Sequence, residues 1–416
     1  MNALSPTDFV IAERTPGGMG LITLNRPQAL NALSLDMIRA LTAELRGWQH
    51  DAAVKAVAIR GMGKSGEGFA PFGAFCAGGD IRFFHQAALA GDAALAEFFT
   101  AEYALNHLIH TYGKPYIAFM DGIVMGGGMG LCQGPSALAA PSGDLTSASG
   151  KPPARQGPSA LAASSGELTS ASGKPLARPG AALRVVTERT KMAMPETRIG
   201  LFPDVGGGYF LSRTPGHLGE YLALTGHVLK GDEAVAATLA DGCVPAAQLP
   251  AIWQHLADTA WPSGIAAQHW VASQFIAASA RQISARGQID HYFGLRTVQA
   301  IVTALEAAGS DWAQHTAQEL RTRSPLMLHV TLEQVRRARH MDLADELRME
   351  RDLVHHCFHL REPGASETVE GIRALAVDKD HAPRWHPARI EDITPDMVAP
   401  FFVSPWAPQA HPLAAL

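Results

Sequence analysis

The first third of the chain alternates short apolar stretches with longer amphipathic ones, and this alternation constrains the fold more than any other feature. A proline-glycine turn at residues 15–18 separates the first two apolar stretches, which read as paired strands. Ser34 can cap the first amphipathic stretch, where leucine and isoleucine recur at helical spacing. The predicted strands cover residues 9–12, 20–24, 56–60 and 116–120, and the predicted helices cover residues 34–49 and 97–110. We therefore expect a layered α/β domain built from repeated β-β-α units.

A low-complexity tandem repeat then interrupts this pattern. Residues 134–155 read GPSALAAPSGDLTSASGKPPAR and residues 157–178 read GPSALAASSGELTSASGKPLAR, so the copies differ at three positions. They contain no aromatic residue and cannot bury enough apolar surface to offset the entropy of ordering. Two copies are also too few to stack into a solenoid. We interpret residues 134–180 as an insertion within the domain.

The chain after the repeat becomes mainly helical. One further strand is predicted at residues 183–186. Predicted helices with apolar residues at helical spacing cover residues 233–239, 250–259, 270–284, 297–308, 313–323 and 332–339. We therefore divide the chain into an α/β core at residues 1–230, which contains the 134–180 insertion, and a mainly helical C-terminal region at residues 231–416.

The composition excludes several classes of function. The formal net charge of −5 argues against a nucleic-acid surface, which needs clustered lysine and arginine. The four cysteines are scattered without a C-x-x-C pair, so we expect neither a disulfide framework nor a structural zinc site, and we expect a cytoplasmic location. We see no secretory signal, and no stretch reaches about 18 unbroken apolar residues, so we expect no membrane span.

Three glycine-rich segments carry the candidate chemistry. They read AFCAGGDI at residues 74–81, VMGGGMG at residues 124–130, and AMPE at residues 193–196 followed by GLFPDVGGG at residues 200–208. Glycine lets a backbone approach a ligand closely, and two N–H groups that converge on one oxygen form an oxyanion hole. Each segment taken alone is more often a tight turn, and the second lacks the spacing of a dinucleotide-binding loop.

Two carboxylates, Glu196 and Asp204, each follow a proline in apolar, glycine-rich surroundings. Such a pair can have separated pKa values and separate roles in catalysis. Both residues can also cap helices, and Asp204 directly precedes Val205-Gly206-Gly207 as an N-cap would. The residues alone leave catalysis and capping equally open.

The order of these motifs resembles that of the crotonase, or enoyl-CoA hydratase/isomerase, superfamily. The resemblance rests on NRP and NAL at residues 25–27 and 31–33, then on FCAGGDI, MGGGMG, MPE and GLFPDVGGGYFL. Within the superfamily the chain is most similar to the 3-hydroxyisobutyryl-CoA hydrolase group. The resemblance covers almost the whole chain outside the tandem repeat, and it implies a crotonase-like α/β fold.

The resemblance also implies a role for each site residue. Gly79 and Gly127 match the backbone N–H donors that hold the thioester oxygen, and Glu196 matches the catalytic glutamate. Asp204 matches an aspartate that the hydrolase group has where most hydratases have glycine. Glu102 matches a glutamate that contacts the substrate, as Gly127, Glu196 and Asp204 also do.

Position 130 separates two activities within the resemblance. Hydratases have a second catalytic glutamate there, whereas this chain has Gly130. The implied activity is therefore hydrolysis of a 3-hydroxyacyl-CoA thioester, 3-hydroxyisobutyryl-CoA to 3-hydroxyisobutyrate and coenzyme A in valine catabolism. Glu196 either attacks the carbonyl or activates water. Coenzyme A enters as part of the substrate, so no separate cofactor is expected. No metal is expected either, because His355 and His359 can share a helix face but lack an evident third ligand.

Two alternatives remain open. An enoyl-CoA hydratase or isomerase is one, and Gly130 argues more strongly against hydration than against isomerisation. A catalytically impaired CoA-binding protein is the other, because the insertion begins four residues after Gly130 and a shifted N–H group would miss the carbonyl. Apart from the acyl-CoA substrate, the partner we consider is a second copy of the chain, since superfamily members commonly self-associate.

Overall fold

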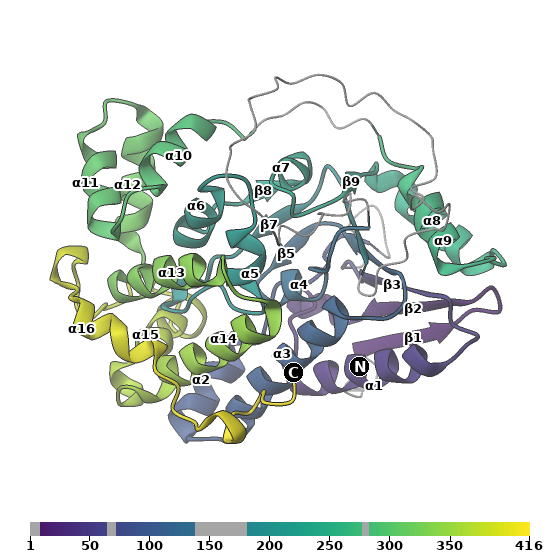
Figure 1. Ribbon diagram of the computed structural model, residues 1–416, viewed down its shortest axis with the longest axis horizontal. Helices are drawn as coiled ribbons and strands as arrows, with labels where there is room; N and C mark the ends of the chain where they lie inside the picture. Colours follow the sequence, from purple (N-terminus) through teal and green to yellow (C-terminus); the bar gives the residue numbers. More distant parts are fainter. Residues whose placement is uncertain (1–8, 65–71, 138–180, 277–282) are drawn as a thin grey trace, which may run out of the picture.

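The computed structural model describes residues 9–64, 72–137, 181–276 and 283–416, and its centre is a six-stranded sheet (Figure 1). The strand order is β1-β2-β3-β4-β6-β9, in which β1 and β2 are antiparallel and the remaining neighbours are parallel. The strands are β1 (Val10–Arg14), β2 (Met19–Leu24), β3 (Ala56–Gly61), β4 (Tyr116–Met120), β6 (Ala182–Val186) and β9 (Gly242–Cys243). The predicted α/β architecture is confirmed, and the predicted strands all occur within one or two residues of their expected ends.

A second, smaller sheet positions two of the candidate functional segments. It contains β5 (Ile123–Met125), β7 (Lys191–Ala193) and β8 (Leu229–Lys230), in that order. β5 and β7 are parallel, with Met125 paired to Ala193. Because parallel strands end at the same edge, the glycines that follow β5 and the MPE segment that follows β7 emerge side by side.

The described part of the chain also contains sixteen α-helices. They are α1 (Leu35–His50), α2 (Ile81–Ala90), α3 (Ala94–His110), α4 (Gly127–Gly130), α5 (Gly207–Ser212), α6 (Leu218–Thr225), α7 (Gly231–Ala236), α8 (Leu249–Asp258), α9 (Gly264–Ala272), α10 (Arg286–Phe293), α11 (Val298–Ala307), α12 (Asp311–Thr322), α13 (Pro325–Ala338), α14 (Leu343–His359), α15 (Glu367–Ile372) and α16 (Pro395–Val398). No described helix is both long and apolar enough to cross a membrane.

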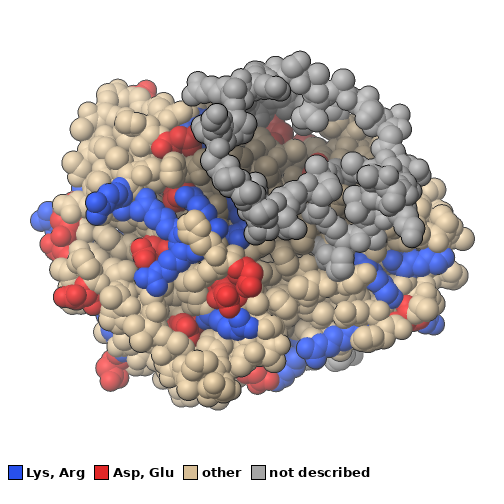
Figure 2. Space-filling model, viewed as in Figure 1, with Lys and Arg blue, Asp and Glu red and all other residues tan. Residues whose placement is uncertain are grey.

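Charged side chains of both signs are mixed on the surface of these helices. On the face shown in Figure 2, lysine and arginine side chains lie among aspartate and glutamate side chains. Arg337 contacts Glu333 at 2.7 Å, and Arg321 contacts Glu306 at 2.7 Å. Exposed ion pairs of this kind contribute little to stability, so the helices must be held by their apolar faces.

The main sheet is buried on both faces because its side chains alternate between two apolar clusters. Val57 and Ile59 of β3 join the cluster that includes α1 and α3, whereas Ala56 and Ala58 join the cluster that includes α8 and α9. This arrangement explains why the parallel strands read as continuous apolar runs and not as alternating ones. Ser34 caps α1 as predicted, since its side chain accepts a hydrogen bond from the Met37 N–H.

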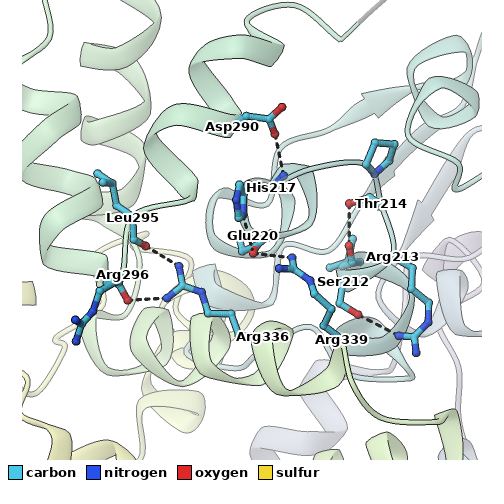
Figure 3. A network of polar contacts seen from close by, with 12 residues as sticks. Ser212, Arg213, Thr214, His217, Glu220, Asp290, Leu295, Arg296, Arg336 and Arg339 are labelled. Carbon is cyan, nitrogen blue, oxygen red and sulfur yellow. Dashed lines mark hydrogen bonds and ion pairs between the residues drawn. The ribbon is translucent and has the colours of Figure 1, made fainter. Parts of the chain in front are cut away.

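The C-terminal helices share the larger apolar cluster with the sheet. α13 packs on α5 and α6, and α14 packs on α3. Figure 3 shows how α13 is held: Arg339 donates a 2.8 Å hydrogen bond to Glu220 of α6, and Arg336 donates to the carbonyl oxygens of Leu295 and Arg296. β9 joins the main sheet after residue 230, so the sheet continues into the second predicted region. The division at residue 230 stays a prediction, and most of the insertion (138–180) lies outside the described residues.

Two helix predictions differ from the structure. The helix expected at residues 270–284 does not continue past Ala272 through residues 273–276, where the Ile276 N–H donates a hydrogen bond to the Cys243 carbonyl at the sheet edge. Residues 277–282 of this prediction lie outside the described residues. The helix expected at residues 332–339 is the second half of α13, which begins at Pro325 with Ser324 as its cap. Tertiary contacts overrode local periodicity in the first case, and a proline at the first helical position was overlooked in the second.

Candidate active site

The three glycine-rich segments meet around one cavity of about 360 Å³. All five residues predicted to act on the substrate line it, namely Gly79, Glu102, Gly127, Glu196 and Asp204. They come from the loop before α2, from α3, from the start of α4, and from the segment between β7 and α5. The structure therefore brings together in one cavity the predicted residues from motifs that lie far apart along the chain.

Gly79 is oriented by its pairing with Leu33. The Leu33 N–H donates to the Gly78 carbonyl at 2.8 Å, and the Asp80 N–H donates to the Leu33 carbonyl at 3.0 Å. In such a parallel bridge, the N–H of the residue between the two bonded neighbours faces the opposite side. That side is the cavity, which Gly79 lines. Gly78 has a φ of +98°, a conformation that favours glycine.

The second glycine segment lies against two carboxyl groups. A Cβ atom at Gly126 would lie 2.8 Å from Glu196 Oε1, and one at Gly127 would lie 2.4 Å from Glu102 Oε1. Gly127 is the first residue of α4, so its N–H is among the donors that a helix cannot satisfy internally. A Cβ atom at Gly78 would be 3.5 Å from the Gly127 nitrogen, so the two glycine segments are in contact. The arrangement suits two N–H donors directed at one carbonyl oxygen.

The three carboxyl groups of the cavity are buried and close enough to repel one another. Burial, and then the negative charge of Asp204, raises the pKa of Glu196 well above its usual value. Burial also raises the pKa of Glu102, with Asp204 and Glu196 adding to the effect. Burial raises the pKa of Asp204 to about 7, although a 3.0 Å hydrogen bond from the Tyr103 hydroxyl acts in the opposite direction. The site can therefore hold both a proton donor and a base near neutral pH.

The side-chain contacts distinguish catalysis from capping. The N-cap residue of α5 is Gly206, which has no side chain, and the Asp204 side chain bonds to Tyr103 and not to the start of this helix. The 3-10 helix Glu196–Ile199 has no side-chain cap at its N-terminus, so Glu196 does not act as one. The Oε2 atom of Glu196 has no hydrogen-bond partner in the described part of the chain. A buried oxygen without a partner beside two candidate oxyanion donors indicates a reactive group more than a structural one.

Position 130, where the resemblance places the second glutamate of hydratases, is crowded by neighbouring side chains. A Cβ atom at Gly130 would lie 2.7 Å from Asn106 Nδ2 and 2.7 Å from the Val205 Cβ. A longer side chain could not enter without moving both neighbours. The site therefore lacks a carboxyl group at this position and also lacks the space for one.

Sequence reasoning missed several residues of the site. Tyr103 holds Asp204, and Arg198 and Arg323 line the cavity. Glu350 of α14 accepts hydrogen bonds from Gly206 and Gly208. A signal for Glu350 existed, because it lies in phase with the apolar residues of the buried face of its helix.

The chain is similar to curated hydrolases over almost its full length. It is 37% identical over 394 residues to the mitochondrial 3-hydroxyisobutyryl-CoA hydrolase of Xenopus tropicalis, covering 93% of this chain and 87% of that protein. The enzyme of the same name from Rattus norvegicus is 34% identical, with coverage of 97% and 91%. Both names state a mitochondrial protein, which overturns our expectation of a cytoplasmic location. Unpaired cysteines distinguish reducing from oxidising compartments but do not distinguish one reducing compartment from another.

Solved structures confirm the expected crotonase-like fold. An enoyl-CoA hydratase from Rhodobacter sphaeroides 2.4.1 has a TM-score of 0.74 and 32% identity, with coverage of 97% of this chain and 99% of that chain. A carnitinyl-CoA dehydratase from Mycobacterium thermoresistibile has a TM-score of 0.73 and 34% identity, with coverage of 95% and 96%. The sequence profile named enoyl-CoA hydratase/isomerase matches residues 19–140 and 178–402, so the unmatched gap falls within the tandem repeat. The chain therefore belongs to the enoyl-CoA hydratase/isomerase family.

Proposed function

We propose that the chain hydrolyses the thioester of a 3-hydroxyacyl-CoA, with 3-hydroxyisobutyryl-CoA as its substrate. The observation that carries this proposal is the pairing of Glu196 with Asp204 in one cavity while position 130 has neither a carboxyl group nor room for one. Addition of water to a double bond in this family uses two glutamates, and only one of them is present. The products, 3-hydroxyisobutyrate and coenzyme A, fit a step of valine catabolism.

The proposed mechanism begins with polarisation of the thioester carbonyl by the N–H groups of Gly79 and Gly127. Negative charge develops on the carbonyl oxygen as a nucleophile adds, so these donors act mainly in the transition state. Loss of one such donor typically costs about 3 kcal/mol. Glu196 either attacks the carbonyl carbon, which gives an acyl anhydride that water then hydrolyses to the free acid, or removes a proton from a water that attacks the carbonyl carbon. In both routes the carbon–sulfur bond breaks, and the thiolate leaves and takes up a proton that water supplies.

Asp204 gives the proposed site its specificity for a 3-hydroxyl group. Its pKa of about 7 leaves it able to accept or donate a hydrogen bond at neutral pH. Tyr103 occupies one of its oxygens, which leaves the other for the substrate. An acyl group without the 3-hydroxyl would leave this buried carboxyl unpaired, and such unpaired polar groups reject analogues strongly.

Two arginines at the cavity suit the phosphates of coenzyme A. Arg198 is exposed, and in the described part of the chain no carboxylate pairs with it. Arg323 is almost buried and donates to the Thr225 carbonyl at 2.6 Å and to Glu319 at 2.8 Å. Its Nε hydrogen finds no acceptor among the described residues. Guanidinium groups bind phosphate oxygens with charge-assisted hydrogen bonds.

The ends of the insertion argue against the impaired CoA-binding alternative. The Ala182 N–H donates to the Pro135 carbonyl at 2.8 Å, and the Ala137 N–H donates to the Ala182 carbonyl at 2.9 Å. The chain therefore leaves and returns at one point, and the entropy of closing such a loop grows slowly with its length. Gly127 keeps its contact with the first glycine segment, so the candidate donors remain together.

Thiol release from 3-hydroxyisobutyryl-CoA tests the proposal. We expect free thiol to appear with the wild-type chain and to be lost with Glu196→Gln, which keeps the shape of the side chain but removes its charge. Isobutyryl-CoA, which lacks the 3-hydroxyl, should be hydrolysed more slowly. Conversion of an enoyl-CoA without thiol release would instead assign the site to a hydratase or isomerase.

A further inference from the structure

Two buried glutamates outside the proposed mechanism lie directly behind Asp204. Glu346 and Glu350 are one turn apart on α14, and neither is exposed to solvent. Their carboxyl groups are close enough for the negative charge of Glu346 to raise the pKa of Glu350, after burial as the larger cause. Burying a carboxyl group is costly unless hydrogen bonds compensate for the lost water. The contacts of the pair therefore indicate what it does for the molecule.

Glu350 holds the backbone that follows Asp204. Its Oε2 accepts a 2.8 Å hydrogen bond from the Gly206 N–H, and its Oε1 accepts a 3.2 Å hydrogen bond from the Gly208 N–H. Gln334 of α13 donates to Glu350 at 3.0 Å and to the Pro203 carbonyl at 2.7 Å. Glu350 thus satisfies the first amides of α5, which no side chain within that segment caps.

The turn needs this support because its backbone is in an unfavourable conformation. Val205 has a φ of +58°, which branched side chains rarely adopt, and Gly206 follows with a φ of +85°. Such conformations persist only where the surroundings impose them. The direction of the Asp204 side chain toward Tyr103 depends on this turn, since Asp204 is the residue immediately before it.

We infer that Glu350 is a positioning residue that fixes Asp204 in the catalytic cavity by binding the amides of Gly206 and Gly208. Three N–H donors form hydrogen bonds with Glu350, so its two oxygens act as acceptors for the turn after Asp204 and for α13. Burial raises the pKa of both groups. The inference rests on the proposed function, because it assigns Asp204 to the reaction.

A pair of matched variants tests the inference. Glu350→Gln keeps the size of the side chain but presents an amide to two backbone donors, whereas Glu346→Gln makes the same change one turn away and leaves both oxygens of Glu350 in place. We expect E350Q to lower kcat for thiol release by about 100-fold, as a displacement of about 1 Å at a reacting group can. KM should stay within about threefold, because the arginines at the cavity mouth are unchanged. E346Q should keep kcat within about threefold, and an unchanged kcat in E350Q would overturn the inference.

The double variant D204N/E350Q separates positioning from general destabilisation. If Glu350 acts through Asp204, the double variant should be no slower than D204N alone, whereas independent effects would multiply. Multiplying losses would overturn the inference. Should E350Q fail to fold, Gln334→Met removes the hydrogen bonds to Glu350 and Pro203 and should give the same non-additive pattern with a smaller loss in kcat. Multiplying losses in D204N/Q334M would also overturn it.

Hydrogen exchange supplies a readout that does not depend on activity. The amides of Gly206 and Gly208 should exchange at least about tenfold faster in E350Q than in E346Q, because Glu350 accepts their hydrogen bonds. If the wild-type chain releases no thiol, the proposed function fails while this measurement still decides whether Glu350 holds the turn. Equal exchange in the two variants would show that it does not.

Discussion

Asp204 should make the protein less stable as the pH rises, and Asp204→Asn should remove that loss. Burial raises the pKa of Asp204 from 3.8 to about 7 in the folded chain. A group whose pKa is raised by folding contributes stability that is fully present below its unfolded pKa and is lost as the pH rises through its folded pKa. The difference between the two values corresponds to about 4 kcal/mol, since each pH unit is worth about 1.36 kcal/mol.

The asparagine of the D204N variant is neutral at every pH and can still accept the hydrogen bond from Tyr103. The free energy of unfolding of D204N should therefore equal that of the wild type near pH 4 and exceed it by up to about 4 kcal/mol above pH 7. The charge of Asp204 also raises the pKa of Glu196 and Glu102, so its removal adds to the gain in the same direction.

Denaturant unfolding at several pH values between about 4 and 8 measures this difference. Glu370→Gln is a control of opposite sign, because hydrogen bonds from Arg373 lower the pKa of Glu370 and its contribution is lost as the pH falls. That variant should lose stability at neutral pH and lose less at low pH. A D204N gain that did not change with pH would refute the reasoning, since it would show that Asp204 is not buried as a proton-retaining acid.

Three further predictions concern the other parts of the site. Gly130→Glu should lower the free energy of unfolding by about 1–3 kcal/mol, because Asn106 and Val205 occupy the space that the new side chain needs. The variant should not hydrate an enoyl-CoA, and measurable hydratase activity would contradict this prediction. Arg198→Glu should raise KM for the acyl-CoA about tenfold, which corresponds to about 1.4 kcal/mol, and the increase should be smaller at high salt. An equal increase in KM for a short pantetheine thioester, which lacks the phosphates, would show that Arg198 does not bind phosphate. Replacing residues 138–180 with a short glycine-serine linker should leave kcat within about threefold, because the hydrogen bonds at Ala182 lie outside the replaced segment, and a large gain in kcat would revive the impaired-enzyme alternative.

The sequence predicted the architecture because local signals and tertiary structure agree over most of the chain. The strands at residues 56–60 and 116–120 are almost wholly apolar, which is the pattern of a parallel sheet buried on both faces. The exception at residues 270–284 shows the limit of periodicity, since the hydrogen bond from Ile276 to Cys243 is a contact that no local window contains.

The site was predicted less completely than the fold. The motifs and their order predicted that Gly79, Gly127 and Glu196 lie together, and the structure brings them to one cavity. Whether Asp204 caps or reacts depends on its contact with Tyr103, which lies 101 residues away in sequence. The contacts of Glu350 with Gly206 and Gly208 are also long-range, so its phase with the buried face of α14 indicates burial but does not reveal its partners.

The pairing of Ala182 with the residues at 135–137 has a consequence for how this chain can change over evolution. These hydrogen bonds hold the end of α4 and the start of β6 together without using residues from the segment between them. A duplication in that segment therefore changes the stability of the fold little, and selection for stability acts weakly against it. The junction is accordingly a natural acceptor for foreign peptides. An affinity tag or a fluorescent reporter could be joined there without touching the catalytic cavity, whose lining does not include residues 135–137 or Ala182.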